Sequence, residues 1–193
     1  MRVSAGRRQS APGVAGALDS ELQPGDVVIG ETYVQHDLVN HTAQGAVPRS
    51  VRSPRDGAEN PIRLGASPFL LALARQAAPG LALEPADTER GARAPRVSLG
   101  TIATGDSFIG AAEKKSALRD EFGAAAVEME GAAVAQVAHE LGVPFLVVRG
   151  LSDRAGGLAR AEAQRNLGAA ARNAAVTALA VARRLGAEPA PAR

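Results

Sequence analysis

Side chains that could carry out acid–base chemistry follow two short apolar runs in the second half of the chain. The runs span residues 124–127 and 145–148, and the side chains that follow them are Glu128, Met129, Glu130, Arg149, Ser152 and Asp153. A carboxyl group in a closed, largely apolar pocket has a raised pKa and can donate a proton near neutral pH. A carboxylate can also accept hydrogen bonds from two neighbouring hydroxyl groups, and an arginine can orient carboxylates. These residue types are therefore candidates for general acid–base chemistry.

The elements expected around these residues would bring them together. A helical pattern of apolar residues follows the acidic pair and ends at Gly142, and Pro144 introduces the second apolar run. In a strand–helix–strand crossover both strands end at the same edge of the sheet, where open α/β sheets bind ligands. Three carboxylates and one guanidinium would then face one crevice. Loop polarity and helix capping are the alternative, and they account for Glu130 but not for Arg149 and Asp153 around a strand end.

Four segments of the chain resemble the signature segments of the purine nucleoside phosphorylase superfamily. They are residues 13–18 (GVAGAL), 100–109 (GTIATGDSFI), 127–131 (VEMEG) and 148–153 (VRGLSD). The pattern is most similar to the hydrolytic branch of that superfamily, the 5′-methylthioadenosine/S-adenosylhomocysteine nucleosidases. The four segments occur in the family's order, and the resemblance extends over most of the chain.

The resemblance implies both a fold and an activity. The fold class is α/β, a three-layer α/β/α phosphorylase/nucleosidase-like fold with a mixed central sheet over residues 12–186, between a basic tail (1–11) and a Pro/Ala tail (187–193). The activity is hydrolysis of the N-glycosidic bond of adenine nucleosides, with release of adenine, in nucleoside catabolism and methionine salvage. The resemblance further implies a homodimer and no cofactor.

The resemblance also assigns roles in the reaction. Asp153 is expected to be the general acid that protonates N7 of the purine, and Ser152 to hold its carboxyl group in place. Glu130 is the expected acceptor for the 2′- and 3′-hydroxyl groups of the ribose, with Met129 against the face of the sugar. Arg149 is expected to orient the acidic side chains rather than to contact substrate.

The remaining expected site residues bind the nucleoside. Phe108 would pack on the purine and Ile109 would offer main-chain hydrogen bonds to the base, although the default interpretation of Phe108 is a core anchor. Glu128 is expected to bind substrate beside the other two members of the acidic segment. Val14 and Ala15 belong to an expected loop, residues 12–18, that lies beside the ribose and the attacking nucleophile.

Two alternatives to hydrolysis stay open at this point. Phosphorolysis, the first, is disfavoured because Val14 stands where the phosphorylases place a hydroxyl group, and valine cannot hydrogen-bond phosphate. A non-catalytic remnant that binds nucleosides is the second. Family members place a strand and a water-activating carboxylate ahead of the first glycine segment, whereas the first acidic residue here is Asp19. The sequence is therefore expected to lack the family's N-terminal segment.

Composition excludes several other classes of protein. Of the 193 residues, 46% are hydrophobic and only 3% aromatic, so Ala, Val and Leu are expected to fill the core. The absence of Cys excludes disulfides and thiol catalysis. Basic residues are scattered and the net charge is only +2, which argues against a nucleic-acid partner. No apolar run suggests a membrane partner or a signal peptide, so a cytoplasmic location is expected. His36 and His41 lack a third ligand, so no metal site is expected.

The rest of the chain predicts further elements and two departures from the family. Strands are expected at residues 26–32 and 97–104, and helices at residues 68–77, 111–122 and 160–185. Residues 42–63 are expected to form a long surface loop. Two stretches that usually carry aromatic residues in the family have none here; they are residues 42–68 and 161–167.

Overall fold

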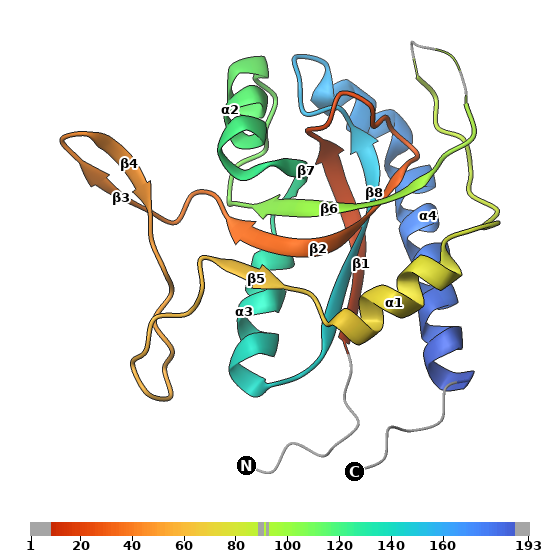
Figure 1. The fold of residues 1–193 in the computed structure, drawn as a ribbon. Helices are drawn as coiled ribbons and strands as arrows, with labels where there is room; N and C mark the ends of the chain where they lie inside the picture. Colours follow the sequence, from red (N-terminus) through yellow and green to blue (C-terminus); the bar gives the residue numbers. More distant parts are fainter. Residues whose placement is uncertain (1–8, 89–90, 92, 188–193) are drawn as a thin grey trace.

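The computed structural model describes residues 9–88, 91 and 93–187, which fold around one central sheet (Figure 1). The strands are β1 (Gln9–Ala17), β2 (Val27–Gln35), β3 (Val39–Thr42), β4 (Gly45–Pro48), β5 (Arg63–Gly65), β6 (Val97–Thr104), β7 (Ala124–Glu128) and β8 (Phe145–Asp153). The helices are α1 (Pro68–Ala77), α2 (Ala112–Phe122), α3 (Gly131–Leu141) and α4 (Ala159–Ala187).

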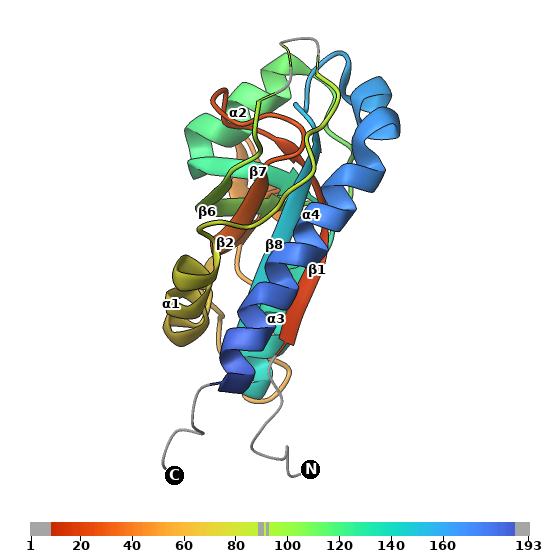
Figure 2. The same ribbon diagram turned by 90° about the vertical axis from the view of Figure 1, so that its right-hand side faces the viewer.

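The central sheet is mixed and closes on itself. Its order is β5-β2-β6-β7-β1-β8, and β8 also pairs with β2, so that five strands form a ring to which β5 is added. Three pairs are parallel (β1 with β8, β2 with β6, β6 with β7) and three are antiparallel (β1 with β7, β2 with β8, β2 with β5). Helices α1 and α4 lie on one side of the sheet and α3 on the other (Figures 1 and 2). The predicted three-layer α/β fold with a mixed sheet is therefore confirmed.

Strand β8 is the centre of this arrangement, and all nine of its residues are buried. Helix α4 crosses it so closely that a Cβ atom on Gly150 would lie 1.9 Å from the carbonyl oxygen of Ala170. Only glycine fits that contact, because the obstacle is helix backbone rather than a movable side chain. The close approach fixes the distance between α4 and β8 at Gly150.

Small aliphatic side chains fill the core, as the composition predicts, and Tyr33 is its largest fully buried member. Its hydroxyl donates to the carbonyl of Gly30 (2.7 Å) and accepts from the amide of Val147 (2.9 Å). The Tyr33 ring also lies against Phe145, with ring centroids 5.3 Å apart. Burial raises the pKa of the Tyr33 phenol, so the group stays protonated and joins β2 to β8.

The first glycine segment is a strand, not the loop that the sequence suggests. Residues 9–17 form β1 and pair in parallel register with β8 along its whole length, starting inside the stretch expected to be a tail. A Cβ atom on Gly13 would lie 2.6 Å from Nη1 of Arg149, and one on Gly16 would lie 2.7 Å from Oδ1 of Asp153. These glycines leave space for the functional side chains of the neighbouring strand. This requirement explains why the segment consists of small residues, a composition that is also typical of turns.

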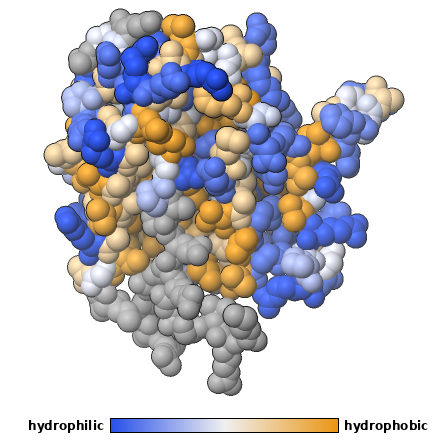
Figure 3. All heavy atoms as spheres, turned by 180° about the vertical axis from the view of Figure 1, so that it is seen from behind, coloured by the Kyte–Doolittle hydropathy of each residue, from blue (hydrophilic) through white to orange (hydrophobic). Residues whose placement is uncertain are grey.

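Two further expectations are corrected. Strand β8 does not end at residue 148 but continues to Asp153, because it is buried on both faces and its polar residues find partners there. The expected long loop contains the hairpin β3–β4, closed at Gly45, whose φ of +117° suits glycine alone. Residues 40–47 of this hairpin are all exposed, and it projects from the body of the molecule (Figures 1 and 3).

Seen from behind, hydrophobic atoms are interspersed with hydrophilic ones over much of the surface (Figure 3). The exposed apolar side chains of α4 include Leu167 and Leu179. Among the described residues, no helix has the length and apolar character needed to cross a membrane. Residues 188–193, most of the expected Pro/Ala tail, lie outside the described part of the chain, as do residues 1–8.

Candidate active site

The last residues of four strands converge on a small cavity of about 40 Å³. Strand β1 contributes Gly16, the turn after β6 contributes Ser107, Phe108 and Ile109, the end of β7 contributes Val127, Glu128 and Met129, and the end of β8 contributes Asp153. Five of these eight residues are site residues expected from the sequence. The structure thus brings Phe108, Ile109, Glu128, Met129 and Asp153 together, at the strand ends where the crevice is expected.

Asp153 is the buried acid of this cavity, with 3% of its surface exposed. Its Oδ1 accepts the amide of Ala155 (2.8 Å), and the hydroxyl of Ser152 donates to its Oδ2 (2.9 Å). Burial raises the pKa of the Asp153 carboxyl group, although these two hydrogen bonds oppose the shift. A carboxyl group that keeps its proton to higher pH is what a general acid requires.

Ala155 holds an unusual backbone conformation next to Asp153. Its φ of +48° is left-handed, and among the described residues no other non-glycine residue has a positive φ. For an alanine this conformation costs about 1–2 kcal/mol. It turns the amide of Ala155 back onto the carboxyl group of Asp153. Strain of this kind clusters at functional sites because the surrounding contacts enforce it.

Glu128 holds the frame of the site together. Its carboxylate accepts hydrogen bonds from Thr104 on β6, from the amide of Gly131 (2.8 Å) and from Nε of Arg149 (2.8 Å). It therefore ties β6, β8 and the N-terminus of α3 to the end of β7. The direct contact with substrate that the resemblance implies for Glu128 stays a prediction.

Two large apolar side chains of the cavity lining are exposed, and the exposed Glu130 follows the second of them in the chain. Phe108 is 56% exposed, so it is not the core anchor that a lone phenylalanine suggests. Met129 is 44% exposed, and the side chain of Glu130 is 71% exposed with Oε2 3.6 Å from Nη2 of Arg149. These groups are available to a ligand, whereas Ile109 is buried behind them.

Three expected binding residues lie outside the cavity lining: the exposed Glu130, and Val14 and Ala15 on β1. Val14 pairs with Gly150 within the sheet, and Ala15 presents its carbonyl to the hydroxyl of Ser152 (3.4 Å). Gly16, the next residue, takes their place in the lining. Gly16 belongs to the expected ligand-binding loop but is not among the expected site residues; in the structure it lies in β1 beside Asp153, just after an irregularity in the register with β8.

His36 is a buried histidine close to Gly105. The part of the chain that the structure describes contains no group of three or more His, Asp or Glu side chains able to hold a metal ion. The imidazole is buried, and within that part neither ring nitrogen has a hydrogen-bond partner. Burial lowers the pKa of His36, which favours its neutral form.

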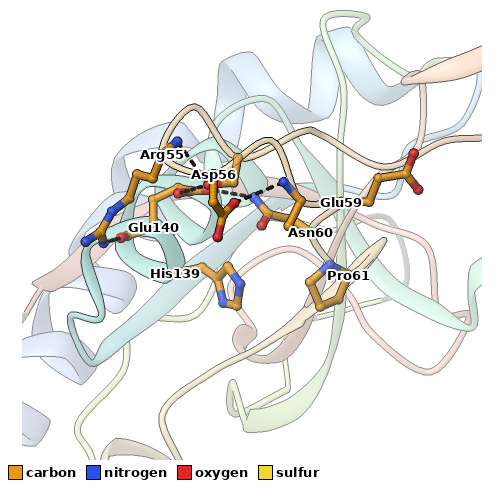
Figure 4. A pocket seen from close by; sticks show the side chains of 9 residues that line it. Arg55, Asp56, Glu59, Asn60, Pro61, His139 and Glu140 are labelled. Carbon is orange, nitrogen blue, oxygen red and sulfur yellow. Dashed lines mark hydrogen bonds between the residues drawn. The ribbon is translucent and has the colours of Figure 1, made fainter.

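A larger hollow of about 560 Å³ lies far from this cluster, between residues 53–61 and the end of α3 (Figure 4). Its polar groups are mostly occupied with one another. The carboxylate of Glu140 accepts from Ser53 (2.8 Å) and Asn60 (2.6 Å), and Arg55 donates to the Glu140 carbonyl (2.5 Å). These bonds attach the loop to α3, so the smaller cavity is the better candidate for chemistry.

Comparisons with known proteins give matches over most of the chain. The profile of the family described as "Phosphorylase superfamily" matches residues 11–186. The 5′-methylthioadenosine/S-adenosylhomocysteine nucleosidase of Mycobacterium bovis is 38% identical over 151 residues, which cover 75% of this chain and 58% of that protein. The nucleosidase of the same name from Tolumonas auensis is 35% identical, over 90% of this chain and 68% of the relative.

Solved structures give the same result. The Neisseria meningitidis nucleosidase in complex with methylthio-immucillin-A has a TM-score of 0.74 at 34% identity, over 91% of this chain and 68% of that one. Futalosine hydrolase of Helicobacter pylori has a TM-score of 0.70 at 32% identity, over 91% and 67%. The chain spans about three fifths of the length of the Mycobacterium bovis relative. By the family profile, the identities and the shared fold, the chain belongs to the phosphorylase superfamily, in the family of the 5′-methylthioadenosine/S-adenosylhomocysteine nucleosidases.

Proposed function

We propose that the protein hydrolyses the N-glycosidic bond of adenine nucleosides, with Asp153 as the general acid. The observation that carries the proposal is the buried carboxyl group of Asp153, with its raised pKa, on a cavity walled by the exposed Phe108 and Met129. A flat aromatic ring and a thioether suit a purine and the face of a sugar. The family supports the substrate class, since its members above are nucleosidases.

In the proposed reaction Asp153 donates its proton to N7 of the bound adenine. Protonation makes adenine a better leaving group, so the bond between C1′ and N9 breaks toward the base and leaves positive charge on the ribose. The exposed carboxylate of Glu130 is placed to accept the ribose hydroxyl groups, while Arg149 steadies it. Water then adds to C1′ and yields the free sugar; the proton that the water loses passes to solvent, and Asp153 is reprotonated from solvent for the next turnover. Ser152 keeps the Asp153 carboxyl group in its orientation.

Adenine release from a panel of nucleosides, with and without phosphate, tests the reaction class. We expect release without phosphate and free sugar as product, because no hydroxyl group stands at Val14 to bind phosphate. A strict requirement for phosphate, with a sugar 1-phosphate as product, would establish phosphorolysis instead. The panel should contain 5′-methylthioadenosine, S-adenosylhomocysteine and adenosine, so that it also identifies the preferred 5′ substituent.

The Asp153→Asn variant tests the assigned acid. The amide keeps the shape of the side chain but cannot protonate N7, so we expect kcat to fall by about 10²-fold or more. Affinity for the nucleoside should stay within about tenfold. Glu121→Gln, a charge removal on the exposed face of α2, is the matched control. Adenine release by Asp153→Asn at the parent rate would remove Asp153 from the mechanism.

We also propose a homodimer in the cytoplasm. The projecting hairpin β3–β4 supports the dimer, because an exposed hairpin that carries Val47 at 48% exposure is suited to contact a second copy.

A further inference from the structure

Two charged side chains from two different helices fasten the segment that follows Asp153. From α2, Nζ of Lys115 donates to the carbonyl of Arg154 (2.6 Å). From α4, the carboxylate of Glu162 accepts the amide of Arg154 (2.9 Å) and its Nε (2.8 Å). Glu162 is only 4% exposed, and the Lys115 side chain is partly buried.

One peptide group connects these contacts to the proposed acid. The carbonyl of Arg154 and the amide of Ala155 belong to the same planar peptide, with its oxygen and its hydrogen on opposite sides. The oxygen accepts from Lys115, and the N–H donates to Oδ1 of Asp153. The ammonium group therefore polarises the peptide that binds the carboxyl group, because hydrogen bonds in a chain strengthen one another.

The same peptide sits in a strained orientation. The φ of Ala155 is +48°, and turning the peptide over would release that strain. The turned peptide would point its oxygen toward Asp153 and its N–H away. Lys115 opposes the turn because it binds the oxygen, and Glu162 opposes it because it holds the preceding amide.

We propose that Lys115 is a positioning residue for the general acid: it locks the Arg154–Ala155 peptide, with Glu162 as the second anchor, and so keeps the Ala155 amide on the Asp153 carboxyl group. The inference deepens the proposed function, since it concerns the acid of that same site. Lys115 does not touch the substrate in this account; it acts through the peptide.

The charges around Asp153 set the expected direction of a pH effect. Lys115 reaches it from α2, Glu162 from α4 and Arg154 from the connecting segment, while Glu128 lies across the cavity on β7. Positive charge on Lys115 lowers the pKa of Asp153, and so does the Ala155 amide. Removing Lys115 weakens both effects, so the pKa of Asp153 must rise.

The test is a carbon-13 carboxyl titration of Asp153 in the full chain without substrate, with the signal assigned by Asp153→Asn. In Lys115→Met we expect Asp153 to titrate at higher pH than in the parent. Lys115→Arg keeps a cationic donor and should restore the parent curve, and Lys114→Met, an exposed charge removal on the same helix, should leave it unchanged. Lys115→Gln replaces Lys115→Met if the latter unfolds.

Adenine release gives the second readout. Lys115→Met should lower kcat by about ten- to a hundredfold through misplacement of the acid, with little change in KM. The limb of the pH profile on which activity falls with rising pH should move to higher pH. An unchanged titration in Lys115→Met, or an equal shift in Lys114→Met, would overturn the inference. Because the titration needs no turnover, its result tests the role of Lys115 even if the proposed function is wrong.

Discussion

At the scale of single residues, Asp153 is a group that the fold holds under conditions that disfavour its charge. It is buried beside Gly16, Ser152 and Ala155, and burial is the largest cause of its raised pKa. A carboxyl group with a raised pKa in the folded state contributes stability that is fully present below its ordinary pKa of 3.8. That stability is lost as the pH rises through the folded pKa. Ionised Asp153 should therefore lower the free energy of unfolding of the protein.

The Asp153→Asn variant should therefore gain free energy of unfolding over the parent as the pH rises. Asparagine keeps an acceptor for the Ala155 amide but carries no charge to desolvate. Urea unfolding at pH 5 and pH 8 measures the difference, which should be larger at pH 8. Asp56→Asn is the control of opposite sign, because the Ala58 amide lowers the pKa of the Asp56 carboxyl group. A variant no more stable than the parent at pH 8 would contradict this account.

Gly16 offers a second test at this scale. A methyl group there would lie 2.7 Å from Oδ1 of Asp153 and 3.2 Å from Cβ of Ala155, so Gly16→Ala should displace the carboxyl group. We expect kcat for adenine release to fall by about 10²-fold, the effect of a shift of about 1 Å. Gly157→Ala is the matched control, since nothing lies within 4 Å of its added methyl group. Parent activity in Gly16→Ala would show that the carboxyl group has room to move.

The sequence predicted the residues of the candidate site better than it predicted their supports. Phe108, Met129 and Asp153 are found through their signature segments, because each segment is a short run of residues that can be recognised in the sequence alone. Arg149 contacts the acidic side chains, as the resemblance implies. The bond that Glu128 accepts from Thr104 depends on how β6 and β7 meet, which no local pattern encodes. Lys115 looks like an ordinary solvated lysine until α2 is placed against the segment after β8.

At the scale of elements, the close contact of α4 with β8 determines the position of α4, which carries Glu162. Gly150→Ala would place a methyl group 1.9 Å from a helix carbonyl, which cannot move without shifting α4. We expect a loss near the upper end for overpacking, about 3 kcal/mol. Urea unfolding measures it, with Gly65→Ala as a control, because nothing lies within 4 Å of that position. A cost below about 0.5 kcal/mol would show that the contact is looser than described.

The periodicity of apolar residues predicted most of the helices and strands. It failed where contacts between distant parts of the chain determine the secondary structure. α1 and β6 have the predicted bounds, since each has clear local signals: Ser67 caps α1 and accepts the amide of Leu70, and β6 is an uninterrupted run. β1 was missed because its glycines look like turn residues. In the structure they leave space for the side chains of Arg149 and Asp153. β8 is longer than predicted because Arg149 is satisfied inside the fold, which its charge alone does not suggest.

At the scale of the whole molecule, the hairpin β3–β4 should contribute to association rather than to the fold. The amide of Arg49 donates to the carbonyl of Leu38 (3.1 Å), so the two ends of the hairpin are adjacent. Replacing residues 39–48 by Asn-Gly should close the gap with a tight turn. We expect an unchanged thermal midpoint and a change from dimer to monomer in light scattering.

Leu179→Ser, which removes an exposed apolar side chain from α4, is the control for that experiment and should leave the dimer intact. A dimer that survives loss of the hairpin would move the proposed contact elsewhere. A fall in the thermal midpoint of the monomeric variant would mean that the hairpin also supports the body of the molecule.

The closed order of the sheet has a consequence for how the protein is made. Val27 pairs with Gly150, and β1 takes its whole parallel partner from residues 145–153, so most of the chain separates the partners. A ribosome therefore releases β1 and β2 long before the strand that joins them exists. Non-local pairing of this kind is slow, and unpaired strand edges invite contacts with other nascent chains. At a translation rate of about 5–20 residues per second, the edges of β1 and β2 stay unpaired for at least several seconds. Chaperones that bind nascent chains should matter most for this protein during that time.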